Sequence, residues 1–288
     1  MKIAVLLFGH LRDFEQCADS LNKNLLSRYD CDVFMHTWDE LDSKTYSWHE
    51  QRVNPVNVST WIGEQIEELY HPIDYIVEHQ EKWQDEQIVK SAYTSNLSFS
   101  TAGMHFMFYS MNRANELRLA YQKKKNVIYD FIVVTRPDVE LLHALDVEKI
   151  IHQADLLGYP IEKCRFFAPM QPSSTWPNAF VTNGTNDILF CAIPDVIDKY
   201  IKANKSIDID FVEKHCINIV SVYTAKELKD GGVFPIPLSF PLGTDWTFSG
   251  VRTKRKQNKY IKSLLFRAGA KLLQPMAKLY DKCAKYSE

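Results

Sequence analysis

Short apolar runs alternate with longer segments of helical spacing through the first half of the chain. A continuous apolar run such as Ile3–Phe8, IAVLLF, is typical of a strand that is covered on both faces of a parallel sheet. We predict strands over four segments: Ile3–Phe8, Cys31–Trp38, Ile73–Glu78 and Tyr129–Thr135. Between them, apolar spacing predicts helices over Phe14–Tyr29, Val58–Tyr70 and Thr101–Lys125. This alternation predicts an α/β domain with a mainly parallel central sheet flanked by helices.

The second half of the chain has a less regular pattern. Asp187–Ile193, DILFCAI, predicts another strand, and Asp195–Asn204 predicts a helix after it. Asp210–Lys229 has mostly helical spacing, whereas Pro and Gly punctuate Gly231–Gly243. Because no internal repeat or clear boundary precedes about residue 250, we expect one domain over residues 1–250 and a separate tail over 251–288.

Composition narrows the class of protein. The 288 residues are 45% hydrophobic and 24% charged, which is typical of a globular protein. The six cysteines show no C-x-x-C pair or metal-type spacing, so we expect reduced thiols in a cytosolic protein. The apolar N-terminal run is interrupted by His10 and Arg12, which favours a first buried strand over a signal peptide.

Charge is divided unevenly along the chain. Residues 252–288 contain 11 Lys and Arg against 2 Asp and Glu, so the remaining 251 residues carry a formal net charge of −11. The acidic body argues against nucleic acid as a partner. If the basic tail is helical, it is amphipathic and kinked at Pro275, which suits an anionic membrane surface. The alternative is a terminal helix docked on the acidic body.

Polar and aromatic residues follow three of the predicted strands. Gly9 and Arg12 come after the first strand, Trp38 ends the second, and Arg136 follows the fourth. The carboxyl ends of parallel strands lie at one edge of a sheet, where ligands gather. Gly9 would let the backbone approach a ligand closely, Arg12 could pair with phosphate or a local carboxylate, and Trp38 could stack on a base. We therefore expect a nucleotide pocket at this edge.

Asp138 and Glu140 in VVTRPDVE are two residues apart. On an extended strand their side chains would point to the same side, where two carboxylates suit a divalent cation such as Mn²⁺ or Mg²⁺ bridging to a diphosphate. Arg136 would orient these carboxylates or meet phosphate. The alternative is a solvated strand end with Arg136 in a salt bridge.

Three stretches, LLFGHLRDFEQC, DVFMHTWDE and NVIYDFIVVTRPDVEL, resemble bacterial glycosyltransferases encoded in lipopolysaccharide and capsule loci. The resemblance covers roughly residues 1–145 and rests on G-x-L-R, F-x-H-T-W and R-x-D-x-[DE] elements. It implies a GT-A-like fold in which the acid-x-acid element, here Asp138 and Glu140, holds Mn²⁺ or Mg²⁺ against a nucleotide-sugar diphosphate. This chain has Glu140 where the commonest metal motif has a second Asp.

The resemblance also implies an activity and its partners. We expect transfer of a sugar from a nucleotide-sugar, with a UDP-sugar favoured, to a surface glycan or glycolipid acceptor. The enzyme would act as a peripheral protein at the cytoplasmic face of the plasma membrane.

An inverting transferase needs a carboxylate that deprotonates the acceptor hydroxyl. Asp187 is the first candidate, with Asp245 and Glu213 behind it. The alternative for Asp187 is a turn cap after Asn-Gly. His10, His36 and His105 are candidates for substrate contact, although a histidine near an apolar strand is more often structural.

Two other functions remain open. A sugar nucleotidyltransferase would share the sheet and the metal, but its first loop should be basic and rich in glycine, unlike FGHLRDF. A catalytically inactive nucleotide-sugar-binding or scaffold protein would have the same pocket. No G-x-S-x-G, Walker or G-x-G-x-x-G pattern appears, which argues against a hydrolase, a kinase and a dinucleotide-binding enzyme.

Overall fold

A computed structural model describes residues 1–42, 58–79, 102–156, 158–168, 187–203, 233–238, 240 and 242–248. The chain divides into two compact units, residues 1–247 and 248–288. The first unit is built on a seven-stranded sheet with the order β3-β2-β1-β4-β7-β6-β8. Its strands are β1 (Lys2–Phe8), β2 (Asp30–Trp38), β3 (Asp74–Glu78), β4 (Phe131–Thr135), β6 (Cys164–Phe167), β7 (Phe190–Ala192) and β8 (Phe234–Pro237).

The sheet is mainly parallel, as expected from the sequence. Strand β1 pairs in parallel with β2 on one side and with β4 on the other, and β2 pairs in parallel with β3. Strand β7 is the exception, because it runs antiparallel to both β4 and β6. Strands β6 and β8 are again parallel. A mainly parallel α/β sheet is therefore confirmed.

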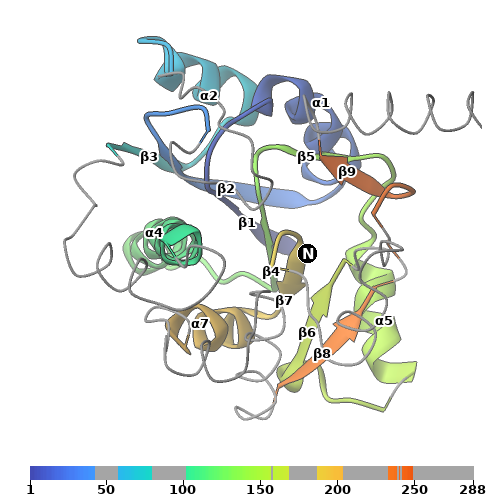
Figure 1. Ribbon diagram of the computed structural model, residues 1–288. Coiled ribbons are helices and arrows are strands. Elements are labelled where there is room, and N and C mark those ends of the chain that lie inside the picture. The colour runs from blue at the N-terminus through green and yellow to red at the C-terminus, as the bar shows by residue number, and fades with distance from the viewer. Residues whose placement is uncertain are drawn as a thin grey trace, which may run out of the picture. The chain divides into compact units, whose positions relative to one another are not determined.

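Helices cover the sheet on both faces. The described helices are α1 (Phe14–Asn24), α2 (Ile62–Tyr70), α4 (Ala102–Lys125), α5 (Val147–Leu156) and α7 (Pro194–Ala203), with short 3₁₀ turns at Leu26–Arg28 and Ile161–Lys163. Helices α4 and α7 pack against each other over one face, and α1 and α2 lie on the opposite side (Figure 1).

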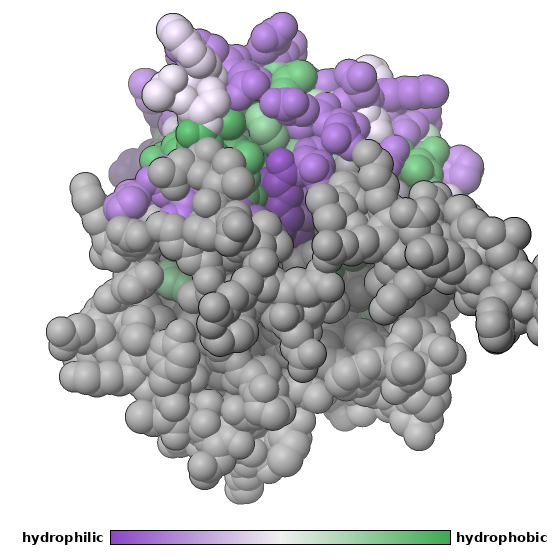
Figure 2. All heavy atoms as spheres, turned by 45° about the horizontal axis from the view of Figure 1, so that its top comes forward, coloured by the Kyte–Doolittle hydropathy of each residue, from purple (hydrophilic) through white to green (hydrophobic). Residues whose placement is uncertain are grey.

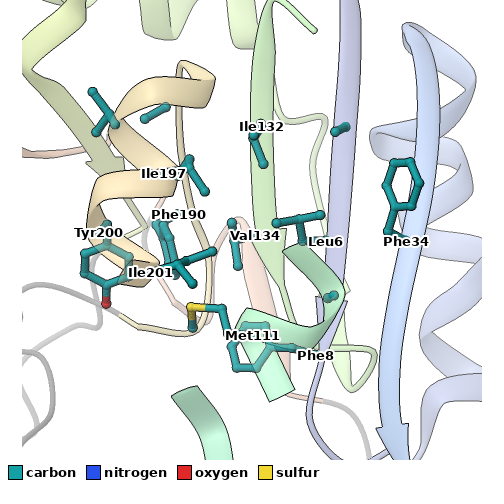
Figure 3. Close-up of a cluster of buried hydrophobic side chains, with 14 of the residues drawn as sticks. Leu6, Phe8, Phe34, Met111, Ile132, Val134, Phe190, Ile197, Tyr200 and Ile201 are labelled. Atoms are coloured by element: carbon teal, nitrogen blue, oxygen red, sulfur yellow. The ribbon is translucent and has the colours of Figure 1, made fainter. Parts of the chain in front are cut away.

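The main core lies between the sheet and the helices α4 and α7. Alternate residues of the central strands, such as Leu6 of β1 and Val134 of β4, point toward Met111 of α4 and Ile197 of α7 (Figure 3). These side chains are fully buried. Since side chains alternate along a strand, the remaining residues of β1 face the other layer. Burial on both faces explains why β1 and β4 are continuous apolar runs in the sequence.

A second, two-stranded sheet pairs β5 (Val139–Leu141) with β9 (Trp246–Phe248). Helix α1 packs on β5 and buries its apolar stripe, which includes Phe14, Cys17 and Leu21. Strand β5 begins after the turn that follows β4.

Most elements of the first half match the predicted ranges within a few residues. The predicted helix Phe14–Tyr29 was too long, because Leu25 leaves helical geometry and a 3₁₀ turn precedes β2. The strands β5, β6, β8 and β9 and the helix α5 were not predicted. The predicted helix Asp210–Lys229 and the tail 251–288 lie outside the described residues.

The described surface is mainly polar on the face that Figure 2 shows. Among the described residues of this face, hydrophobic ones gather left of centre and in a smaller group at the right. Within the described ranges, each helix is too short or too polar to cross a membrane. The described cysteines, Cys17, Cys31, Cys164 and Cys191, are free thiols, as expected.

Candidate functional site

The strand order creates a switch point between β1 and β4. From β1 the chain proceeds to β2 and β3 on one side, and then returns to the other side of β1 to form β4. In open α/β sheets, ligands bind outside the carboxyl ends of the strands at such a reversal. The loops after Phe8 and Thr135 flank this point. The first loop contains the candidate site residues Gly9 and Arg12, and the second contains Arg136 and Asp138.

The loop after β1 has an unusual backbone. Gly9 has a φ of +92°, and Arg12 has a φ of +47° although it carries a side chain. Non-glycine residues in this region are strained, and such strain concentrates at functional sites. The loop is held by two bonds: the Gly9 N–H donates to Ser110 Oγ at 2.7 Å, and the Arg12 N–H donates to the Leu41 carbonyl at 2.9 Å.

Arg12 and Arg136 converge on one buried carboxylate, that of Asp138. Arg136 Nε donates to Asp138 Oδ1 at 2.7 Å, and Arg136 Nη2 donates to Oδ2. Arg12 Nη1 also donates to Oδ2, at 3.0 Å, while Arg12 Nε donates to Asp42 Oδ1 at 2.9 Å. The side chain of Asp138 is 2% exposed, against 17% for Arg12 and 15% for Arg136. Asp138 is thus the most enclosed of the three side chains.

The charges of this cluster stabilise one another. Burial alone would raise the pKa of Asp138, but Arg136 and Arg12 outweigh it and lower the pKa to about 2. Burial lowers the pKa of Arg136, and the nearby positive charge of Arg12 lowers it further. Asp138 is therefore ionised at neutral pH, and the two guanidinium groups are balanced in formal charge by the carboxylates of Asp138 and Asp42.

The structure corrects the expected geometry of Asp138 and Glu140. Strand β4 ends at Thr135, and the Val139 N–H closes a turn by donating to the Arg136 carbonyl at 3.2 Å. Asp138 lies in this turn, where Pro137 cannot donate to a strand ladder. The expectation of one extended strand carrying both carboxylates was therefore wrong. Asp138 is buried, and the partly exposed Glu140 lies in the separate strand β5.

The residues in this arrangement do not fit the expected Mn²⁺ or Mg²⁺. A carboxylate offers roughly four lone-pair positions, and guanidinium N–H groups occupy three of those of Asp138. A metal at the remaining position would lie beside two cations, and like unit charges about 4 Å apart repel by about 4 kcal/mol at an effective dielectric of about 20. Among the described residues, no group of three His, Cys, Asp or Glu side chains could hold a metal.

Asp187 lies at the same edge of the sheet because β7 runs antiparallel to β4. Val134 pairs with Phe190, so the residues before Phe190 continue past the carboxyl end of β4. Asp187 is partly buried there. Its withdrawal from solvent raises its pKa, and the charges of Arg136 and Arg165 oppose this rise without cancelling it.

Arg165 of β6 was not predicted from the sequence. It is fully buried, and its guanidinium carbon lies 4.8 Å from the ring centroid of Phe190 and 4.5 Å from that of Tyr200. These contacts are cation–π interactions. Arg165 also acts on the Asp187 carboxyl, so it contributes positive charge behind the edge of the sheet.

A second polar cluster supports the ends of β1 and β2. Ser110 Oγ lies 2.7 Å from His36 Nδ1, and His36 Nε2 lies 3.6 Å from Glu78 Oε2. The order of these groups resembles a hydrolase triad, but Ser110 is 0% exposed and its oxygen accepts the Gly9 N–H. The serine is therefore enclosed, and the cluster ties the β1 loop to β2 and α4. Burial lowers the pKa of His36 to about 4, although Glu78 opposes this shift.

The aromatic candidates lie beside this cluster. Trp38 is 1% exposed and stacks on Tyr109 with ring centroids 5.7 Å apart. Its edge contacts include His36 and Phe106. His10 is also buried, 6.4 Å from the Trp38 ring. In this structure Trp38 is therefore buried, and one face of its ring stacks on the protein's own Tyr109.

The remaining candidates lie elsewhere or outside the described residues. Asp245 pairs with His143, whose Nδ1 lies 3.1 Å from Asp245 Oδ1. The backbone carbonyl of Asp245 also accepts a hydrogen bond from the Leu142 N–H. This places Asp245 beyond the far end of β5, roughly 13 Å of extended chain from Asp138. Glu213 and the side chain of His105 lie outside the described residues.

Sequence reasoning missed Ser110, Asp42 and Arg165. Ser110 and Asp42 each form a hydrogen bond with a site residue in another segment, and the charge of Arg165 lowers the pKa of Asp187. None of the three belongs to a recognisable motif. Comparison of the chain with known protein families and with curated proteins finds no match.

Proposed function

We propose that the chain is a glycosyltransferase that binds a nucleotide-sugar donor at the carboxyl ends of β1 and β4. One observation carries this proposal. Two of the three elements on which the resemblance rests, G-x-L-R after β1 and R-x-D-x-[DE] after β4, meet at the switch point through the hydrogen bond between Arg12 and Asp138. Ligand binding at such a point is a general property of open α/β sheets.

The β1 loop supports a close approach of the donor. Gly9 has an open space where a Cβ atom would lie, since no atom beyond its two chain neighbours comes within 4 Å. Its positive φ also suits glycine. A nucleotide phosphate or ribose can therefore approach the backbone at this position.

Asp187 is the proposed general base of the transfer. The acceptor hydroxyl attacks the anomeric carbon of the donor sugar and gives its proton to the Asp187 carboxylate. The bond between this carbon and the diphosphate oxygen breaks, and the nucleoside diphosphate leaves with the electron pair. A raised pKa makes a carboxylate a stronger base, which supports this role.

The proposed substrates are a UDP-sugar and a glycan or glycolipid acceptor. The proposal places the protein at the cytoplasmic face of the plasma membrane, with the basic residues 251–288 on the anionic lipid surface. Support for this part comes from the charge of the tail and from the resemblance.

Incubation with a panel of UDP-, GDP-, CDP- and dTDP-sugars tests the activity. The full chain should release one nucleoside diphosphate, slowly by hydrolysis and faster with an acceptor. Tight binding without release would favour an inactive nucleotide-sugar-binding protein. Release of pyrophosphate from a nucleoside triphosphate and a sugar phosphate would favour a nucleotidyltransferase. An Asp187→Asn variant controls for contaminating hydrolases.

A further inference from the structure

The carboxylate expected to hold a metal instead holds two guanidinium groups. Both oxygens of Asp138 accept hydrogen bonds from Arg136, and Oδ2 also accepts one from Arg12. Asp138 is 1% exposed, so the charge that it presents to a ligand is largely cancelled by these partners. The side chains of the two arginines are more exposed than that of Asp138.

Arg12 has the capacity to bind a further anion. A guanidinium group has five N–H donors, and the described contacts of Arg12 use Nε for Asp42 and Nη1 for Asp138. The fork geometry of guanidinium matches phosphate oxygens, and such charge-assisted bonds are stronger than neutral ones. The side chain is 17% exposed, so a ligand can reach it.

The backbone fixes the position of Arg12. Its φ of +47° is uncommon for a residue with a side chain, and the N–H bond to Leu41 together with two carboxylate contacts maintains it. A side chain held in this way loses little conformational entropy when it binds a ligand. The positioned Arg12 should therefore bind an anion with a smaller entropic cost than a mobile arginine would.

We propose that Arg12, positioned by Asp138, binds the donor diphosphate and offsets the charge of the leaving group, so that the site needs no divalent cation. Arg136 adds a second guanidinium group from the β4 side. This inference rests on the proposed function, because it assigns the diphosphate of the donor to these residues. It differs from the expectation of a metal held by Asp138 and Glu140.

Calorimetric titration of the full chain with UDP, in excess EDTA and in excess Mn²⁺, tests the inference. The UDP affinity should agree within about threefold between the two conditions. Arg12→Ala should weaken UDP binding by about tenfold to a hundredfold in EDTA, which is the usual loss for a hydrogen bond to a charged group. The matched control is Arg28→Ala, an exposed arginine before β2, which should leave the affinity unchanged.

Chemical rescue separates binding by Arg12 from a structural role. Guanidinium ion below its denaturing concentration should restore UDP affinity to the Arg12→Ala variant and leave Arg28→Ala unaffected. A defect in folding would not respond in this way. Arg12→Lys keeps the charge without the fork, and an intermediate affinity is expected.

The outcomes distinguish the inference from the proposed function. UDP binding that requires Mn²⁺, together with Mn²⁺ binding that Asp138→Asn abolishes, overturns the inference alone. An Arg12→Ala variant that folds and binds UDP like the wild type also overturns it. If no nucleoside diphosphate binds under either condition, the proposed function fails and the inference fails with it.

Discussion

Arg12 Nη1 lies 3.0 Å from Asp138 Oδ2, although 126 residues separate the two in the chain. This bond joins the loops after β1 and β4 across the switch point of the sheet. The loop after β1 has positive φ angles at Gly9 and Arg12, and the loop after β4 contains Pro137. The ion pair therefore defines the geometry of the candidate donor site.

The buried ion pairs of Asp138 predict a loss of stability in acid. The pKa is lowered from an ordinary 3.8 to about 2, so the stabilisation is present above pH ~4 and is lost as the pH falls toward 2. We expect a change of about 2 kcal/mol in the free energy of unfolding. Urea unfolding at several pH values measures this free energy. In the Asp138→Asn variant, the free energy of unfolding should fall less steeply between about pH 4 and pH 2. Asp155→Asn, at an exposed site in α5, should keep the steeper fall of the wild type.

His36 predicts a second loss of stability in a different pH window. Its pKa is lowered from 6.5 to about 4 by burial, against the opposing charge of Glu78 and with Arg113 and Glu116 also acting on it. Below pH 6.5 the unfolded chain binds a proton that the folded chain does not, so the folded state loses about 3 kcal/mol by pH ~4.

The measurement is again urea unfolding as a function of pH, with His36→Gln as the variant. This substitution should flatten the profile between these pH values, whereas the exposed His152→Gln should not. A His36→Gln profile as steep as that of the wild type would contradict the assignment.

Gly9→Ala tests the role of the β1 loop. The positive φ of Gly9 predicts a loss of about 1 kcal/mol in stability, since the space for a Cβ atom is open. Gly158→Ala is a matched control, because Gly158 also has a positive φ and open space. Both variants should lose similar stability by thermal unfolding, but only Gly9→Ala should weaken UDP binding. Equal UDP affinity in the two variants would argue against a donor at this loop.

Asp187→Asn should abolish most of the transfer activity. Removal of a general base costs about a hundredfold to ten-thousandfold in rate, while the UDP affinity should be unchanged. The wild-type rate should fall in acid as Asp187, whose pKa is raised by burial, takes up a proton. Steady-state kinetics against pH measures both effects. Asp195→Asn, at an exposed site in α7, provides the control, and a full rate in Asp187→Asn would exclude this base.

Removal of residues 252–288 should release the protein from anionic vesicles. The segment carries 11 Lys and Arg against 2 Asp and Glu, and each basic residue near an anionic surface contributes about 1 kcal/mol. Co-sedimentation with phosphatidylserine vesicles and with neutral vesicles compares the two chains. Equal sedimentation of the truncated and full chains would contradict attachment through the tail.

The sequence predicted which residues lie at the carboxyl edge of the sheet more reliably than which side chains contact one another there. The apolar runs of β1, β2 and β4 are long enough to identify, and parallel pairing then brings Gly9, Arg12 and Arg136 to one edge. The direct bond between Arg12 and Asp138 was left open, because side-chain partners so far apart in the chain leave no local signal.

Local conformation explains the other differences. Asp138 was expected in an extended strand, but the turn at Pro137 separates it from Glu140. Strands β6 and β8 have four residues each, which is too few to show a periodic pattern in the sequence. The partner of Gly9, Ser110, lies within a long helix and belongs to no motif.

A crystal structure of the full chain with UDP, grown in EDTA, tests the central claim most directly. We expect the UDP diphosphate at the carboxyl ends of β1 and β4, within hydrogen-bonding distance of the Arg12 guanidinium. UDP bound elsewhere, or a diphosphate at this edge that contacts neither Arg12 nor Arg136, would contradict it.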